Sequence, residues 1–99
     1  MSEGIIVRDK HVRIDGIQMH ITALGDYYRG IMLEENSDNN VFHISNNIIR
    51  GTSTNTYNYH YGIVTWAGNP GDRVYIYNNI VYDFQDDSWQ GIGITLNSD

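Results

Sequence analysis

Apolar and polar residues alternate in short stretches, and one such stretch returns four times along the chain. Each copy opens on glycine followed by isoleucine, at Gly4-Ile5, Gly30-Ile31, Gly62-Ile63 and Gly91-Ile92. The copies therefore start 26, 32 and 29 residues apart. Alternate residues of a strand point to one face, so each copy predicts a strand whose aliphatic residues, one and three places after the glycine, face a core. The residues between them form an unusually apolar outward column: Ile6, Met32 and Val64.

A second alternating stretch follows each of the first three copies. Its inward positions form two columns, Val12, Phe42 and Val74 and then Ile14, Ile44 and Ile76, while Arg13, His43 and Tyr75 face outward between them. The stretches end at Asp15-Gly16, Asn46-Asn47 and Asn78-Asn79, residue types that tolerate the left-handed backbone of a sharp corner. A third strand then begins at Ile17, Ile48 and Ile80, which makes the first copy one residue shorter. We expect the paired asparagines to hydrogen-bond from copy to copy as a ladder.

Self-similarity at this period is typical of a solenoid, in which repeats stack because none buries its apolar face alone. No apolar period of 3.6 residues runs for a useful length, so the sequence predicts no helix. The expected fold is all-β, a single domain over residues 1–99 with about three and a half turns of three short strands. An antiparallel sandwich is the alternative, because it also accepts short alternating strands.

The repeats resemble a right-handed parallel β-helix, the fold of pectate lyases, polygalacturonases and phage tailspikes. Two segments carry the resemblance, 41–49 (VFHISNNII) and 74–81 (VYIYNNIV), each preceded by its Gly-Ile strand. The resemblance implies a pectin-lyase-like architecture over nearly the whole chain and polysaccharide as the associated ligand. It assigns no catalytic residue, because the polygalacturonase Gly-His-Gly element is missing and the Arg-x-Lys element precedes the acidic residues.

Charge and composition exclude several classes of function. The net charge is −6 with six Lys plus Arg, which argues against nucleic acid or an anionic membrane surface as partner. The chain has no cysteine, and it has no apolar run of about 18 residues that would span a membrane. Residues 1–3 lack the layout of a signal peptide. These features leave the cellular compartment open.

Aromatic residues are the first candidates for a binding site. Flat rings stack on the apolar faces of sugars, and four predicted outward rings make a candidate glycan site: Trp66, Tyr75, Tyr77 and Trp89. The alternative is that rings stack on one another between repeats, which contributes about 0.5–1.5 kcal/mol per pair.

Carboxylates are the second candidates. Asp83, Asp86 and Asp87 lie close in sequence, where a pair would serve glycoside hydrolysis as acid or base. Asp86 and Asp87 are also candidate ligands for Ca²⁺, the one cofactor considered, although the calcium-loop pattern is missing. Solvated loop acids are the alternative interpretation. The four histidines show no zinc-ligand spacing, so no zinc site is expected.

The predicted stack has open strand edges and an apolar core at both ends. Edges of this kind favour pairing with another chain. We therefore expect either self-association or a piece of a longer β-helix. Three functions follow: a carbohydrate-binding module or a fragment of a polysaccharide-active protein; a polysaccharide lyase or glycoside hydrolase whose site forms in an oligomer; and a structural, tailspike-like assembly protein.

Overall fold

The computed structural model describes residues 4–22, 27–34, 37–52, 59–65, 69–84 and 90–96. All regular structure in these ranges is β-strand, and no helix among them is long and apolar enough to cross a membrane. The first repeat contains β1 (Ile5–Val7), β2 (His11–Asp15) and β3 (Gln18–His20). The second contains β4 (Tyr27–Leu33), β5 (Val41–Ser45) and β6 (Ile48–Arg50). The third contains β7 (Tyr59–Thr65), β8 (Arg73–Tyr77) and β9 (Ile80–Tyr82), and β10 (Gln90–Leu96) follows it.

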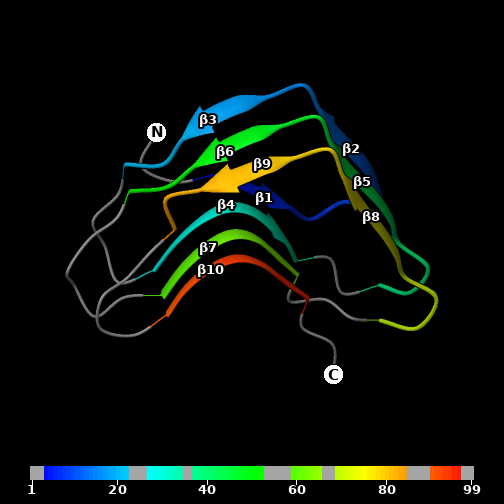
Figure 1. Cartoon of the computed structure of the whole chain (residues 1–99). Helices are drawn as coiled ribbons and strands as arrows, with labels where there is room; N and C mark the ends of the chain where they lie inside the picture. Colours follow the sequence, from blue (N-terminus) through cyan, green and yellow to red (C-terminus); the bar gives the residue numbers. More distant parts are fainter. Residues whose placement is uncertain are drawn as a thin grey trace.

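The strands form three parallel sheets, ordered β1-β4-β7-β10, β2-β5-β8 and β3-β6-β9. Each repeat contributes one strand to each sheet in the same order, so equivalent strands lie side by side (Figure 1). Every pairing among the described strands is parallel, which excludes the antiparallel sandwich. The stacked parallel arrangement is compatible with a parallel β-helix.

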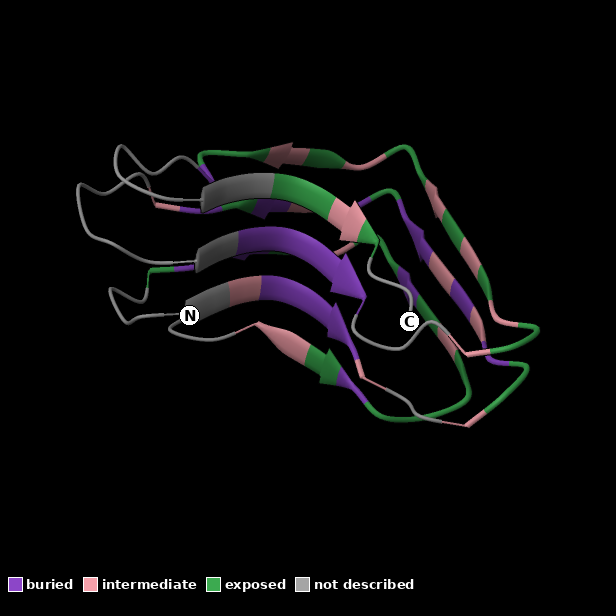
Figure 2. Cartoon of the chain, turned by 90° about the horizontal axis from the view of Figure 1, so that it is seen from below, coloured by how far each residue is buried: buried purple, intermediate pink, exposed green. Residues whose placement is uncertain are grey.

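The inward columns predicted for the second strand are present. Val12 pairs with Phe42 and Phe42 with Val74, while Ile14 pairs with Ile44 and Ile44 with Ile76. Together with the first sheet these residues enclose one core, whose most buried members are Ile21, Ile31, Leu33, Phe42, Ile44, Ile49 and Ile63. Burial is concentrated in the middle of the stack (Figure 2).

Glycine recurs before the isoleucine of each first strand for a steric reason. A Cβ on Gly30 would lie 2.6 Å from Ile49 Cγ2 and 2.5 Å from the Gly62 carbonyl oxygen, and a Cβ on Gly62 would collide with Val81 Cγ1. The glycine therefore faces the core beside the inward isoleucine that follows it. Two consecutive residues face inward only because the first has no side chain.

Strand register corrects the alignment of the fourth copy. Ile94 pairs with Ile63 and Leu96 with Thr65, so Gly93, and not Gly91, is the repeat glycine of β10. The predicted column through Ile92 is wrong by two residues.

Register also corrects the first corner. Gln18 pairs with Ile48, which places Ile17 opposite Asn47. The first copy is therefore not shorter at its corner. The expected left-handed corner is confirmed, because φ is 74° at Gly16 and 56° at both Asn46 and Asn78.

The outward apolar column of the first sheet is present but is not uniformly exposed. Ile6 pairs with Met32 and Met32 with Val64. Ile6 is 44% exposed, whereas Met32 and Val64 are buried and form a second, smaller cluster with Tyr61. The middle of this sheet therefore buries side chains on both faces.

Candidate functional site

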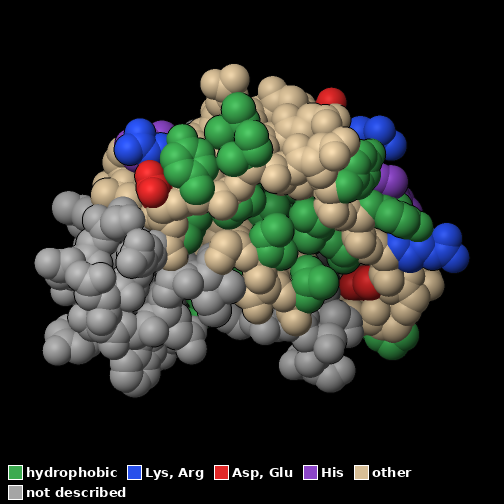
Figure 3. All heavy atoms as spheres, in the orientation of Figure 1, with side chains coloured by type: hydrophobic (Ala, Val, Ile, Leu, Met, Phe, Trp, Pro, Cys, Tyr) green, Lys and Arg blue, Asp and Glu red, His purple; other side chains and the backbone are tan. Residues whose placement is uncertain are grey.

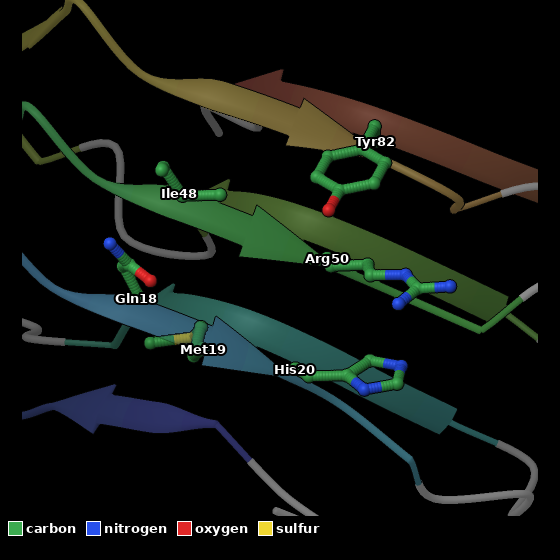
Figure 4. A pocket seen from close by; sticks show the side chains of 6 residues that line it. All are labelled: Gln18, Met19, His20, Ile48, Arg50 and Tyr82. Carbon is green, nitrogen blue, oxygen red and sulfur yellow. The ribbon is translucent and has the colours of Figure 1, made fainter.

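A hollow of about 270 Å³ lies on the outward face of the sheet β3-β6-β9. Its lining comes from all three repeats: Gln18, Met19, His20, Ile48, Arg50 and Tyr82 (Figure 4). The ladder register creates this set, because Gln18 pairs with Ile48, His20 with Arg50, and Arg50 with Tyr82. Each strand is three residues long, so its two end residues face outward and its middle residue faces the core.

Arg50 is the central polar group of the hollow. Its Nε donates to Asp83 Oδ2 at 3.0 Å, and its Cζ lies 5.9 Å from the centroid of the Tyr82 ring. Both members of the ion pair are partly exposed, with side-chain exposures of 49% for Arg50 and 41% for Asp83. The pair is held close to a solvent-facing ring and carries no net charge.

His20 lies at the other end of the same column. Thr52 Oγ1 donates to the Ile21 carbonyl at 2.7 Å and lies 3.4 Å from His20 Nε2. Figure 4 shows His20 and Arg50 extending in the same direction from β3 and β6. The lining of the hollow thus combines an imidazole, a guanidinium, a primary amide and a phenol ring, and the carboxylate paired with that guanidinium comes from Asp83, next to Tyr82 in the chain.

The outward face of β2-β5-β8 has a different character. Tyr75 and Tyr77 both point outward from β8, with exposures of 43% and 45%, which confirms their predicted orientation. Tyr75 stacks on His43 with ring centroids 4.7 Å apart and an interplanar angle of 12°. This spacing equals the distance between neighbouring strands, so one face of the Tyr75 ring is covered by the preceding repeat. The ring-stacking interpretation holds for this pair.

A second hollow of about 260 Å³ lies beside these rings, lined by His11, Val12, Arg13, Val41 and His43. His43 Nδ1 is buried there with no hydrogen-bond partner. On the same face Asp15 accepts hydrogen bonds from Ser45 Oγ at 2.9 Å and from Asn46 Nδ2 at 2.8 Å. The bond from Asn46, then that from Ser45, and then the charge of Arg13 lower the pKa of Asp15 below its ordinary value.

The polar corners are built from side chains that reach back to the preceding repeat. Asn47 Nδ2 donates to the Ile14 carbonyl and Asn79 Nδ2 to the Ile44 carbonyl, at 3.0 and 2.8 Å. The predicted asparagine ladder is therefore confirmed for Asn47 and Asn79. A second polar cluster, which the sequence did not reveal, joins buried Asn40 to Asp72 Oδ1 through its backbone N–H at 2.9 Å and its Nδ2 at 3.0 Å.

Most of the other predicted site residues fall outside the part of the chain that the structure describes. Trp66 and Trp89, the remaining members of the predicted glycan site, lie outside the described residues, as do the candidate catalytic and Ca²⁺-binding residues Asp86 and Asp87. Asp83 is described and pairs with Arg50. Within the described ranges no group of three or more His, Asp or Glu residues is placed to hold a metal ion.

Four lining residues of the hollow were not predicted as site residues from the sequence: Gln18, His20, Arg50 and Tyr82. All four face outward from the third strand of a repeat: His20, Arg50 and Tyr82 are equivalent in register, and Gln18 is equivalent to Ile48. Comparison of the chain with protein-family models, with curated proteins and with solved structures finds no match.

Proposed function

We propose that the chain is a right-handed parallel β-helix module that binds carbohydrate in the hollow on β3-β6-β9. The repeat order through three parallel sheets supports the β-helix. The observation that carries the binding site is the Arg50–Asp83 pair beside the exposed Tyr82 ring. A pyranose presents an apolar C–H face to such a ring and hydroxyl groups to such a pair. The hollow offers both within one column of the sheet.

The charge of the site favours a neutral sugar. The negative charge of Asp83 neutralises the positive charge of Arg50. The carboxylate can then accept a hydrogen bond from one sugar hydroxyl and the guanidinium can donate to another, and the ligand need not carry a negative charge. The chain as a whole carries a net charge of −6, which repels an acidic polymer at long range. We therefore propose hydroxyl-rich, uncharged oligosaccharide as the ligand class. Gln18 and His20 supply further hydrogen bonds at the rim.

The experiment compares two tyrosines of equal exposure on different sheets. Tyr82 is 44% exposed in the hollow, and Tyr75 is 43% exposed on the neighbouring face. Binding of soluble neutral hexose and pentose oligomers, and of polygalacturonate as the acidic probe, is measured by calorimetry. We expect Tyr82→Ala to weaken binding at least tenfold, about 1.4 kcal/mol, and Tyr75→Ala to leave it unchanged.

Three results would overturn the proposal: no binding by any neutral oligomer, a preference for polygalacturonate, or loss of binding in Tyr75→Ala alone. Thermal unfolding of each variant separates a lost contact from a lost fold. The lyase or hydrolase function stays a prediction, because Asp86 and Asp87 lie outside the described residues. The tailspike-like assembly function also stays a prediction.

A further inference from the structure

Four outward side chains form a square on the second sheet. The register pairs His11 with Val41 and Arg13 with His43, and all four line the hollow of about 260 Å³ together with Val12. Paired residues on neighbouring strands lie about 4.8 Å apart, and alternate residues of one strand lie about 6.6 Å apart. The four side chains therefore surround one point above the sheet. Three of them carry N–H groups, and the fourth, Val41, is short and apolar.

Arg13 supplies the positive charge of this hollow. Within the described part of the chain, ion pairs form at Arg8 and at Arg50, and none forms at Arg13. The Arg13 side chain is exposed on β2, so its guanidinium is open to a ligand from solvent. Figure 3 shows Lys, Arg and His side chains over the side of the molecule that carries β2, β5 and β8. The hollow is thus a cationic feature on a chain of net charge −6.

The neighbouring acids stand outside the hollow. Asp15 lies two residues beyond Arg13, and its Oδ1 accepts hydrogen bonds from Ser45 and Asn46 at the corner of the sheet. Asp9 precedes β2 and is exposed. Neither acid lines the hollow. A ligand seated there would therefore contact the guanidinium and not a carboxylate.

His43 is the most constrained member of the square. Its ring stacks on Tyr75 of β8, and Arg13 occupies the equivalent position on β2, on the other side of the ring. Its Nδ1 is buried with no hydrogen-bond partner among the described residues. Because a buried N–H without an acceptor is costly, the neutral ring keeps its proton on Nε2. Nε2–H is then the donor that remains for a ligand.

We propose that this hollow binds a tetrahedral oxyanion, the phosphate or sulfate group of a ligand. Arg13 pairs with two of its oxygens in a bidentate fork, and the imidazoles of His11 and His43 donate to the others. A carboxylate has two oxygens, which the guanidinium alone would occupy. A cation is a poor ligand, because Arg13 lies beside both histidines and would repel it. The site lies on a different sheet from the proposed carbohydrate hollow and does not depend on it.

The charge of the whole chain limits the size of the ligand. The screening length is about 8 Å at physiological ionic strength, so distant acids count little against a group in contact with Arg13. A polymer of such groups would extend over the rest of an acidic surface and be repelled. The ligand class is therefore a small molecule with one phosphate or sulfate group, or the free ion.

The first test is a titration of the ¹⁵N-labelled chain with sulfate, phosphate and acetate, followed by amide nuclear magnetic resonance at fixed pH and ionic strength. We expect saturable shifts at residues 11–13 and 41–43 with sulfate and phosphate, and weaker binding of acetate. No saturable shift with either tetrahedral ion, acetate binding as tightly as sulfate, or shifts centred on Arg50 in the other hollow would each overturn the proposal.

Three variants separate a built site from general attraction by charge. Arg13→Gln should weaken sulfate binding on the order of tenfold, because it removes the bidentate partner. Arg13→Lys keeps the charge without the fork, so we expect a smaller loss of roughly threefold. Arg8→Gln is the matched control, since it removes the same charge outside the hollow and should leave affinity unchanged.

Unchanged affinity in Arg13→Gln, or an equal loss in Arg8→Gln, would overturn the proposal. Arg13 is exposed, and the amide spectrum of each variant shows directly whether the fold is retained. Phenyl phosphate compared with inorganic phosphate distinguishes the two sources of the group. Tighter binding of the ester, whose ring has Val41 as an apolar neighbour, would assign the site to a larger ligand. Tighter binding of inorganic phosphate would assign it to the free ion.

Discussion

Asn79 Oδ1 accepts two hydrogen bonds from Asn47, one from its backbone N–H and one from its side-chain Nδ2, both at 3.0 Å. Asn47 in turn accepts from the Ile17 backbone N–H at 2.9 Å through its own Oδ1. Asn47 is 1% exposed, so these bonds form away from water. At the corner between the second and third sheets, the sharp turn leaves backbone groups without backbone hydrogen-bond partners. Side-chain amides supply these partners and so hold the corner.

Replacing Asn47 should cost more stability than any other change at this corner. Asn47→Ala removes the side-chain partners of the Ile14 carbonyl and the Ile17 N–H, and unsatisfied buried groups of this kind cost about 1–3 kcal/mol each. We expect a loss of about 3 kcal/mol in the free energy of unfolding, measured with urea. Asn78→Gly is the control, since Asn78 is exposed with φ at 56° and glycine accepts that conformation. Equal losses in the two variants would contradict the ladder's role.

The repeat glycines should differ in their tolerance of a methyl group. Gly62→Ala forces a Cβ against Val81 and the Gly93 carbonyl, so we expect it to lose about 2–3 kcal/mol. Gly93→Ala should change stability little, because its nearest neighbour would be Val81 Cγ1 at 3.9 Å, an ordinary contact. The measurement is thermal or urea unfolding of both variants. An equally destabilised Gly93→Ala would mean that β10 packs more tightly than the structure shows.

Asp15 should make the free energy of unfolding depend on pH in the acidic range. Its pKa is lowered in the folded state by the hydrogen bonds from Asn46 and Ser45, relative to an ordinary value of 3.8. A lowered folded pKa gives stabilisation that is complete above the ordinary value and is lost as the pH falls through the folded one. Nuclear magnetic resonance titration of the Asp15 carboxyl should show a midpoint below 3.8, and Asn46→Gly should raise it. A midpoint unchanged in Asn46→Gly would argue against that bond.

The Arg50–Asp83 pair should matter for binding and little for stability. Both side chains are partly exposed, and pairs of this kind contribute about 0–1 kcal/mol. Asp83→Asn should therefore leave unfolding nearly unchanged and reduce neutral-oligosaccharide affinity severalfold, because the amide replaces an ionic acceptor. Glu34→Gln is the matched control, since the exposed Arg8–Glu34 pair at 3.3 Å lies outside the hollow. The proposal fails here if both substitutions reduce affinity equally.

The strands and inward columns were predictable because one pattern recurs at nearly constant spacing. Two details of register were not. Gly91 and Gly93 both precede an isoleucine, and sequence alone does not say which faces the core; packing selects Gly93, which sets Ile94 beside Ile63. Ile17 resembles Ile48, yet the left-handed residue at Gly16 fixes the corner and places Ile17 beside Asn47.

The candidate site was less predictable than the fold. His20, Arg50 and Tyr82 share a column but no residue type, so a search for a repeated motif passes over them. These residues lie close together because of the strand register of the third sheet. The sequence left that register uncertain, because the length of the first corner was predicted to be one residue shorter than it is. The exposed Tyr75 and Tyr77 were correctly placed outward, but the stacking of Tyr75 on His43 depends on ring geometry that no pattern of residue types specifies.

Asn47 and Asn79 each donate from the side-chain amide to a carbonyl of the preceding repeat, which gives the ladder a direction. The Ile17 N–H is satisfied by a residue thirty positions later, and the Asn47 N–H by one thirty-two positions later. During synthesis from the N-terminus, a corner is thus completed only when the next repeat has emerged from the ribosome. Each asparagine thus satisfies the turn of the repeat before it, so neither of these two corners is completed by its own repeat alone.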